Sequence, residues 1–338
     1  MSSLFRNKSW LVLLALSMLL IVSACGGSSS SDTPAETPAA SGSNNNTNEG
    51  SGSAAEGESR TIKHAMGEET LTGTPERVVV LTNEGTEALL AVGVKPVGAV
   101  QSWVGDPWYD HIKDQMEGVE VLGEETQPNI ELIAGLKPDL IIGNKVRHEQ
   151  IYDQLKQIAP TVFAEELSGN WKNNMTLYAE AVNKKAEGEQ AFADFDKRVE
   201  EVKSKLGEKA NTKVSVVRFT AADVRTYMKD SFSGVMLEQL GIARPADQDK
   251  NEFVEKLTKE RIPAMDGDVM FYFVQEDVGS TDAQKAAEEW MNEPLFQSLN
   301  VAKTGEVHQV NEVVWNLAGG YLAANLLLEE IATYFEVN

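Results

Sequence analysis

Three arginines stand where the chain could bind an anion. Arg218 lies inside the apolar run VSVVRF, Arg225 follows seven residues later, and Arg147 lies in the stretch NKVRH. A guanidinium presents a planar fork of N–H donors that matches the paired oxygens of a carboxylate or hydroxamate. These residues therefore predict a site for an anionic, oxygen-rich ligand, with no catalytic nucleophile required.

Arg218 has a second interpretation. Burying a guanidinium without a partner costs several kcal/mol, so either a ligand anion or a protein carboxylate must accompany it. Glu238, Asp223 and Asp230 are the carboxylates that we consider as internal partners. The sequence leaves open whether Arg218 faces a ligand or belongs to an internal ion pair.

Seven further residues are candidates for the same site. They are polar or aromatic, and most of them follow an apolar run that predicts a strand. An aromatic ring can pack on the apolar part of a ligand, and an amide or phenol can donate to its oxygens. Each tryptophan has a place in the core as its alternative. The candidates are Tyr227, Trp103, Trp315, Lys145, Asn83, Trp171 and Asn316.

Two sets of apolar runs predict the strands that position these residues. The first set is 77–82, 96–100, 138–143 and 161–164, and the second is 212–219, 268–274 and 306–310. Such runs alternating with helical patterns are typical of parallel sheets covered on both faces. In open parallel sheets, ligands bind outside the carboxyl ends of the strands, which is where most of the candidates fall.

A long helical segment separates the two sets. Residues 187–208 contain no proline and place Phe192, Phe195 and Val199 at helical spacing. At about 1.5 Å per residue this segment spans roughly 30 Å, the width of a domain. We predict an α/β fold with two Rossmann-like lobes of mostly parallel sheet, joined by one long α-helix, with the ligand cleft between the lobes.

The two sets also resemble each other. ELIAGLKPDLII (131–142) parallels ERIPAMDGDVMF (260–271), and EALLAVGVKP (87–96) parallels VMLEQLGIARP (235–245). The matches occur in the same order, which indicates a duplicated architecture. Glu131 and Glu260 occupy equivalent positions, each at the head of a short helical segment before a strand. Favourable placement of a carboxylate near a helix N-terminus is the alternative explanation for both.

The chain begins with an export signal. Arg6 and Lys8 precede an apolar stretch from Trp10 to Val22, which ends at Val22-Ser23-Ala24-Cys25. The stretch is shorter than the roughly 20 apolar residues of a membrane span. Residues 26–59 are Gly, Ser, Asn, Thr, Ala, Pro and Glu with a few charges, a composition that predicts a flexible tether. Its reach is about 30–35 Å.

Composition excludes several functions. The chain has a net charge of −22, which disfavours nucleic acid, and its four His and single Cys are scattered, which disfavours a zinc site. It has no phosphate loop, nucleophile elbow or metalloprotease motif. An exported α/β enzyme is the remaining alternative to a binding protein.

Four segments carry a resemblance to a known family. They are RVVVLTNEGTEALLAVGVKPVGA, PNIELIAGLKPDLIIGNKVRHEQIYDQLKQIAPTV, VRFTAADVRTYMKDSFSGVMLEQLG and VVWNLAGGYLAANLLLEEI. Together with the single linking helix, they resemble the substrate-binding lipoproteins of bacterial ABC importers, in the branch that takes iron siderophores, cobalamin, haem and some metals. The resemblance covers about residues 60–338 and is greatest for the receptors of ferric hydroxamate and citrate-hydroxamate siderophores.

The resemblance implies a domain order and a set of partners. Residues 1–24 are the signal peptide, 25–59 the lipidated Cys25 and its tether, 60–186 and 210–338 the lobes, and 187–209 the linking helix. It implies a monomer, anchored by lipid on the extracytoplasmic face of the membrane of a Gram-positive cell. Glu131 and Glu260 would dock on an ABC permease dimer with its cytoplasmic ATPase. No cofactor or protein-bound metal is implied, since the siderophore itself holds the iron; haem and cobalamin are alternative ligands.

Overall fold

A computed structural model of the chain describes residues 59–276 and 280–337. Contacts divide the chain into two units, Met1–Gly52 and Ser53–Asn338, and all described residues belong to the second unit. The predicted signal peptide, Cys25 and the tether up to residue 58 lie outside the described residues. Among the helices that are described, none is long and apolar enough to cross a membrane.

The first lobe is built on a five-stranded parallel sheet with the order β5-β4-β3-β8-β9. Its central strand is VVV, with all three side chains fully buried, so both faces of the sheet are covered. This confirms the parallel sheet expected from continuous apolar runs. The strands are β3 (Val78–Val80), β4 (Gly98–Ala99), β5 (Glu120–Val121), β8 (Leu140–Asn144) and β9 (Thr161–Ala164).

Short helices connect these strands. They are α1 (Asn83–Ala91), α2 (Ile130–Leu136), α3 (Lys145–His148), the 3-10 turn Glu149–Ile151, α4 (Tyr152–Lys156), the 3-10 turn Ser168–Asn170 and α5 (Trp171–Ala181). Side chains cap several of them: the Thr82 hydroxyl accepts from the Gly85 amide, and Asn129 accepts from the amides of Glu131 and Leu132. A two-stranded ladder, β6 (Gly123–Glu124) with β7 (Gln127–Pro128), lies between β5 and α2.

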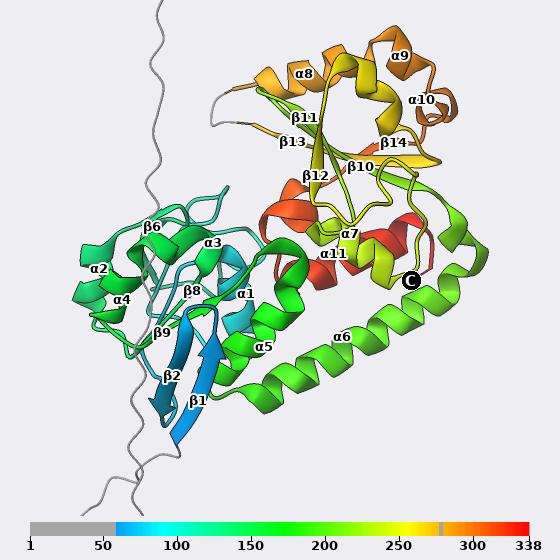
Figure 1. Cartoon of the computed structure of the whole chain (residues 1–338). Helices are drawn as coiled ribbons and strands as arrows, with labels where there is room; N and C mark the ends of the chain where they lie inside the picture. Colours follow the sequence, from blue (N-terminus) through cyan, green and yellow to red (C-terminus); the bar gives the residue numbers. More distant parts are fainter. Residues whose placement is uncertain (1–58, 277–279, 338) are drawn as a thin grey trace, which may run out of the picture. The chain divides into compact units, whose positions relative to one another are not determined.

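An N-terminal hairpin that we did not predict precedes the first sheet. Strands β1 (Ser59–His64) and β2 (Gly67–Thr72) pair antiparallel beside α5 (Figure 1). Arg60 fixes the hairpin there by donating to the carbonyls of Glu180 and Ala181 at 3.1 and 2.7 Å. Only Ile62 and Leu71 are buried, so the sequence lacks the alternation that would have revealed the strands.

The second lobe contains a mixed sheet with the order β12-β11-β10-β13-β14. β10, β13 and β14 are parallel, whereas β11 and β12 run antiparallel to their neighbours. We predicted only the three parallel strands, so the sequence analysis missed this antiparallel edge. The strands are β10 (Val214–Thr220), β11 (Val224–Tyr227), β12 (Val254–Leu257), β13 (Val269–Gln275) and β14 (Val307–Gln309).

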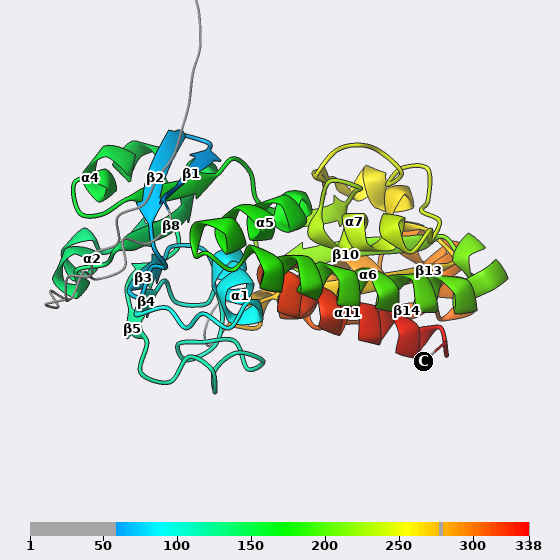
Figure 2. The same cartoon turned by 90° about the horizontal axis from the view of Figure 1, so that it is seen from below.

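The helical elements of the second lobe are α7 (Phe232–Gln239), the 3-10 segment η4 (Lys259–Met265), α8 (Asp282–Met291), α9 (Pro294–Gln297), α10 (Asn300–Thr304), the π-helical turn Val313–Leu317 and α11 (Tyr321–Tyr334). The predicted linker is α6 (Lys185–Leu206), followed by the 3-10 turn Gly207–Asn211. Figure 1 shows α6 running from the first lobe to the second, and Figure 2 shows α11 beside it. Phe195 and Val199 of α6 are buried, as their spacing predicted.

The observed architecture supports the internal repeat. β3 and β10 hold the third position of their five-stranded sheets, and β8 and β13 hold the fourth. The helices that follow β3 and precede β12 end at Gly93 and Gly241, with φ of 74° and 73°, a backbone conformation that only glycine adopts readily. The repeat thus extends from sequence to strand order, apart from the reversed direction of β11.

Candidate ligand-binding site

One cavity brings the predicted arginines together. Its volume is about 300 Å³, at the lower end of the range typical for small-molecule sites, and residues of both lobes line it. The lining residues are Asn83, Glu84, Trp103, Glu125, Arg147, Leu167, Ser168, Arg218, Arg225, Tyr227, Phe253, Gln275, Asn316, Leu317, Ala318 and Gly319.

A pair of antiparallel strands builds the wall from the second lobe. Arg218 on β10 lies directly opposite Arg225 on β11, and Tyr227 is two residues further along β11. Since side chains alternate between the faces of a sheet, the three side chains share one face. None of the strands predicted from the sequence contains Arg225, yet it lies on β11, which gives its side chain a fixed direction.

Like charges directly opposite each other destabilise a strand pair, and carboxylates compensate for both of them here. Arg218, which is 8% exposed, places Nη2 2.6 Å from Oε1 of Glu312 and 2.5 Å from Oε1 of Gln275. Its Nη1 donates to the Tyr227 hydroxyl at 3.4 Å. The internal ion pair therefore exists, but with Glu312 and not with Glu238, Asp223 or Asp230, while Arg218 also lines the cavity.

Arg225 is held by a two-pronged contact. Its Nε and Nη2 donate to the two carboxylate oxygens of Asp223 at 2.6 and 2.9 Å. Lys256 approaches the same carboxylate at 2.8 Å. Hydrogen bonding from Arg225, together with Lys256, lowers the pKa of Asp223 to about 2 despite partial burial. Arg225 is thus presented to the cavity with its orientation already set.

Glu125 organises the wall from the first lobe. It is 5% exposed, and its Oε2 accepts from the backbone amide and the side-chain amide of Asn83 at 2.9 and 3.0 Å. Its Oε1 lies 3.4 Å from Nε of Arg147, whose guanidinium stands 5.7 Å from the ring centre of Trp103. Arg147 lies in α3, and its side chain is 38% exposed, so it is held less firmly than the other two arginines.

His148 supports Glu125 from behind. It is 1% exposed, its Nδ1 accepts from the Asn144 amide at 3.2 Å, and its Nε2 lies 2.8 Å from the Glu125 carbonyl. This arrangement needs a neutral ring with the proton on Nε2, and burial lowers the pKa of His148 accordingly. His148 is thus a buried residue behind the cavity wall and does not line the cavity itself.

A second carboxyl of the first lobe, Glu84, is neutral at pH 7. Burial raises its pKa to about 8, and the neighbouring Glu125 and Glu87 add to the effect. Asn174 donates to Oε1 of Glu84 at 2.6 Å. A protonated Glu84 leaves the cavity with one carboxylate for each arginine: Glu125 for Arg147, Glu312 for Arg218 and Asp223 for Arg225.

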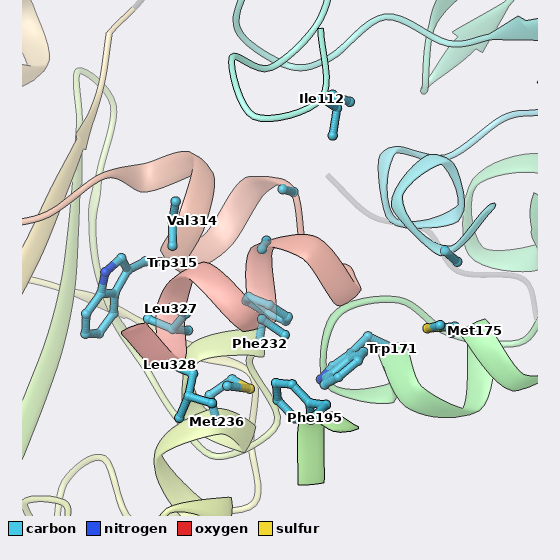
Figure 3. Packing of buried hydrophobic residues seen from close by; sticks show 14 of the residues in the cluster. Ile112, Trp171, Met175, Phe195, Phe232, Met236, Val314, Trp315, Leu327 and Leu328 are labelled. Carbon is cyan, nitrogen blue, oxygen red and sulfur yellow. The ribbon is translucent and has the colours of Figure 1, made fainter. Parts of the chain in front are cut away.

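Seven of the ten predicted ligand residues line the cavity, and three do not. Trp171 is 1% exposed and packs edge-on against Phe195 and Phe232 in the core (Figure 3). Trp315 is also 1% exposed, and its Nε1 donates to Glu330 at 2.6 Å. The core alternative therefore holds for both tryptophans. Lys145, the first residue of α3, lies outside the lining and pairs with Glu165 at 2.6 Å.

The sequence analysis missed other lining residues. Glu125 lies in the turn of the β6–β7 ladder, and Phe253, which is 44% exposed, precedes β12. Neither follows a predicted strand, so the rule of strand ends could not find them. For Phe253, the sequence shows only an aromatic residue within a polar stretch, and its exposure beside the cavity is known from the structure.

The two predicted docking glutamates lie on equivalent elements. Glu131 is in the first turn of α2, which precedes β8, and Glu260 is in η4, which precedes β13. Both are exposed. The Thr258 side chain lowers the pKa of Glu260, so this carboxylate is ionised at neutral pH. Their helix-terminal position is equally consistent with a purely local role.

The chemistry offered by the cavity is recognition. Guanidinium, amide and phenol donors surround a space with the apolar groups of Trp103, Phe253 and Leu317 at its edge. Within residues 59–276 and 280–337, no group of three His, Cys, Asp or Glu side chains could hold a metal ion. Such a wall suits a ligand whose surface carries anionic oxygens and apolar carbon.

Comparison with known proteins agrees with this fold and cavity. Residues 78–313 match the family described as periplasmic binding protein. The probable siderophore-binding lipoprotein YfiY of Bacillus subtilis is 56% identical over 286 residues, which cover 82% of this chain and 88% of the relative. The achromobactin-binding periplasmic protein of Dickeya dadantii is 34% identical over 264 residues, covering 76% of this chain and 86% of the relative.

A solved structure extends the likeness to three dimensions. The crystal structure of Staphylococcus aureus SirA complexed with staphyloferrin B superposes with a TM-score of 0.77 at 34% identity, covering 82% of this chain and 98% of that one. These relatives are binding proteins, which agrees with the expectation that the chain is not an enzyme. The chain belongs to the periplasmic binding protein family, in which two α/β lobes joined by a long helix bind a substrate for transport.

Proposed function

We propose that this protein captures a ferric siderophore outside the cytoplasm and delivers it to an ABC permease for iron uptake. The ligand that we propose is of the hydroxamate or citrate-hydroxamate type. One observation carries the proposal: three arginines from two lobes meet at one cavity that also has aromatic walls. An intact ferric chelate presents the anionic oxygens and carbon surface that such walls recognise, and the chelator itself supplies the ligands of the iron.

Several relatives support this ligand class. The Fe(3+)-citrate-binding protein YfmC of Bacillus subtilis is 28% identical over 285 residues, covering 83% of this chain and 88% of the relative. The relatives named for siderophore, achromobactin and staphyloferrin B binding are more similar in sequence. Because these ligands differ, the comparisons support a ferric chelate as a class, and the arginines favour one that bears carboxylate groups.

Haem is the first alternative ligand, and it would need an axial ligand such as the phenol of Tyr227, which lines the cavity. Burial raises the pKa of the Tyr227 phenol, which is 2% exposed and accepts a hydrogen bond from Arg218. A phenol that stays protonated is a poor axial ligand for iron, so this geometry disfavours haem. Cobalamin carries little negative charge and would leave the three guanidinium groups without a function.

The delivery step involves partners on both sides of the membrane. We propose that Glu131 and Glu260 meet the two halves of a permease dimer, which its cytoplasmic ATPase drives. The protein would act as a monomer, tethered by lipid on Cys25 at the surface of a Gram-positive cell. Cys25 lies outside the described residues; loss of fatty-acid labelling in Cys25→Ala is the check on the anchor.

The ligand is tested by titrating the purified protein with a panel of compounds. The panel contains ferric staphyloferrin B, ferric citrate, a ferric hydroxamate, haem and cobalamin, with tryptophan fluorescence as the readout because Trp103 lines the cavity. We expect saturable quenching by at least one ferric chelate and weaker or no binding by its iron-free form. Preferential binding of haem or cobalamin would overturn the proposal.

A further inference from the structure

Two glycines bring the lobes into close contact beside the cavity. Gly169, in the 3-10 turn of the first lobe, packs on the carbonyl of Asp230 in the second. Gly320, directly before α11, packs on Glu87 of α1 in the first lobe. Each glycine is the chain neighbour of a lining residue, Ser168 in one case and Gly319 in the other.

Neither contact has room for a side chain. A Cβ on Gly169 would stand 2.7 Å from the Asp230 carbonyl oxygen, and a Cβ on Gly320 would stand 2.7 Å from Oε2 and 2.8 Å from Cβ of Glu87. The shortest of these distances is 0.7 Å below the 3.4 Å at which ordinary van der Waals contact begins. An alanine at either position therefore forces atoms apart.

At Gly169, both sides of the contact are firmly held. The Asp230 turn is fixed by backbone hydrogen bonds from Met228 to Phe253, from Lys229 to Lys250 and from Asp230 to Glu252. On the opposite side, the Glu166 carbonyl accepts from the side chains of Asn144 and Asn174 at 2.7 and 2.6 Å.

At Gly320, Glu87 is equally constrained. Its side chain is fully buried, Oε1 lies 2.5 Å from Nε2 of His111, and Oε2 accepts from the Ala323 amide at 2.8 Å. Ala323 is in the first turn of α11, so a residue of the first lobe caps a helix that packs on the second. Because local adjustment is restricted at both contacts, added bulk is relieved by moving one lobe relative to the other.

From these contacts we infer that Gly169 and Gly320 are specificity-determining residues, which set the distance between the lobes and thereby the width of the ligand cavity. The inference rests on the proposed function in taking a ferric chelate as the ligand that spans the cavity. Arg147 approaches from one lobe and Arg218 and Arg225 from the other, so a change in lobe spacing changes whether one ligand reaches all three.

The test compares four single alanine variants of the full-length protein. Gly169→Ala and Gly320→Ala add a methyl group at the lobe contacts. Gly188→Ala adds one against Ala179 at 2.9 Å, where α6 packs on α5, and Gly135→Ala adds one where no atom lies within 4 Å. The last two variants control for packing strain away from the cavity and for the substitution itself.

We expect Gly169→Ala and Gly320→Ala to bind ferric staphyloferrin B about tenfold more weakly, the loss expected when one charge-assisted hydrogen bond is broken. Gly188→Ala and Gly135→Ala should stay within about twofold of the unmodified protein. The inference is overturned if both contact variants bind normally, or if Gly188→Ala weakens binding to the same degree. If the unmodified protein binds no ferric chelate, the proposed function fails instead.

A fifth variant covers the case in which an alanine variant does not melt cooperatively. Glu87→Asp adds no atom but withdraws the carboxylate from Gly320 and from the Ala323 amide. We expect affinity for the same ferric chelate to fall several-fold in a protein that still melts cooperatively, at a somewhat lower temperature because the cap on α11 is weakened. Normal affinity in a cooperatively folded Glu87→Asp protein would remove this contact from the inference.

Discussion

The two lobes use the same strand order to build different walls of one cavity. The first lobe has a fully parallel sheet, and its contributions come from the loops and helices that follow the strands, as with Arg147 in α3. In the second lobe, β11 runs back antiparallel beside β10, so two of its cavity residues, Arg225 and Tyr227, lie on a strand. A strand restricts a side chain more than a loop does, and the second lobe presents the better-ordered donors.

The carboxylate partners of the three arginines add to this difference in side-chain order between the lobes. Glu312 and Asp223 contact Arg218 and Arg225 at 2.6 Å, whereas Glu125 approaches Arg147 at 3.4 Å. We therefore expect the ligand to bind to the second lobe first, and the side chains of Arg147 and Trp103 in the first lobe to become ordered around it. A preorganised wall loses less side-chain entropy on binding than a mobile wall.

The largest effect is expected at a feature that the two lobes share, an exposed glutamate in the helical element before the fourth strand of each sheet. The double variant Glu131→Ala/Glu260→Ala should nearly abolish iron uptake in cells while ligand affinity is unchanged, because both of the proposed contacts with the permease are removed. A charge-assisted contact contributes about 1.5–3 kcal/mol, so each single variant should weaken docking about tenfold or more. Uptake of ferric chelate in cells that lack the native protein provides the measurement.

A matched control for docking is Glu189→Ala/Glu200→Ala, which removes two exposed carboxylates from α6. This variant should transport normally. Normal uptake in the Glu131/Glu260 variant would assign both residues to their helix ends and end the docking proposal. A defect in only one single variant would show that the lobes dock unequally.

Arg218→Ala should have the next largest effect. It leaves Glu312, which is 9% exposed, without its partner, and breaking a buried ion pair commonly costs about 3–5 kcal/mol of unfolding free energy. Affinity for the ferric chelate should fall about 10- to 100-fold in addition. Melting temperature and affinity measured on the same sample separate the two effects.

Two further variants help to interpret the result of Arg218→Ala. Arg218→Lys should restore part of the stability but little affinity, because the planar fork is lost. Arg261→Ala removes a guanidinium that pairs with Glu255 and Asp247 at the surface, and it should change neither quantity much. If Arg218→Ala loses stability but keeps its affinity, Arg218 serves the fold alone.

Comparing Arg225→Ala with Arg147→Ala tests the contrast between the lobes directly. Each variant removes one guanidinium from the cavity, and in each the carboxylate left behind keeps another partner. Asp223 keeps Lys256, and Glu125 keeps both hydrogen bonds from Asn83. We expect Arg225→Ala to weaken binding about tenfold and Arg147→Ala by only a few-fold, because Arg147 must be ordered by the ligand. Equal losses in a fluorescence titration would contradict the difference in preorganisation.

The same contrast explains how far the sequence predicts this molecule. Continuous apolar runs predicted the parallel strands, and helical spacing around Phe195 predicted α6, because burial on both faces dictates residue type. The hairpin β1–β2 and the antiparallel edge of the second sheet are half-exposed, so their composition carries a weaker signal. The sequence therefore predicts the fold class, but it does not predict the strand that carries Arg225.

Within the site, the sequence indicated residue types but not their contacts. An arginine inside an apolar run drew attention to Arg218, which lines the cavity. Its partner Glu312 is 94 residues away in the sequence, and no spacing rule connects the two. Tryptophans suit a core as well as a pocket, and two of the three predicted ones, Trp171 and Trp315, belong to the core. No residue near His148 in the sequence indicates that the β6–β7 turn covers it, so its burial could not be predicted.

A buried carboxyl of the first lobe, Glu84, makes the stability of the protein depend on pH. Burial raises the pKa of Glu84 to about 8, against an ordinary value of 4.5, so folding favours the protonated form. Between these values the unfolded chain is ionised while the folded protein keeps the proton. The contribution of Glu84 to the free energy of unfolding should therefore be greatest below pH 4.5. It should be lost as the pH rises through 8.

Glu84→Gln removes that dependence, because the amide is neutral at every pH and can still accept from Asn174. Thermal melts of both proteins between about pH 5 and 9 should converge at the acidic end, and the variant should melt higher at the alkaline end. The difference should grow by up to about 1.4 kcal/mol per pH unit until the folded carboxyl ionises. Glu189→Gln on the exposed face of α6 serves as the control and should follow the unmodified protein throughout.

A pH-independent difference between Glu84→Gln and the unmodified protein would show that Glu84 is ionised in the folded state. Its charge would then act against an anionic ligand beside Arg147, and the pairing of one carboxylate with each arginine would no longer describe the cavity.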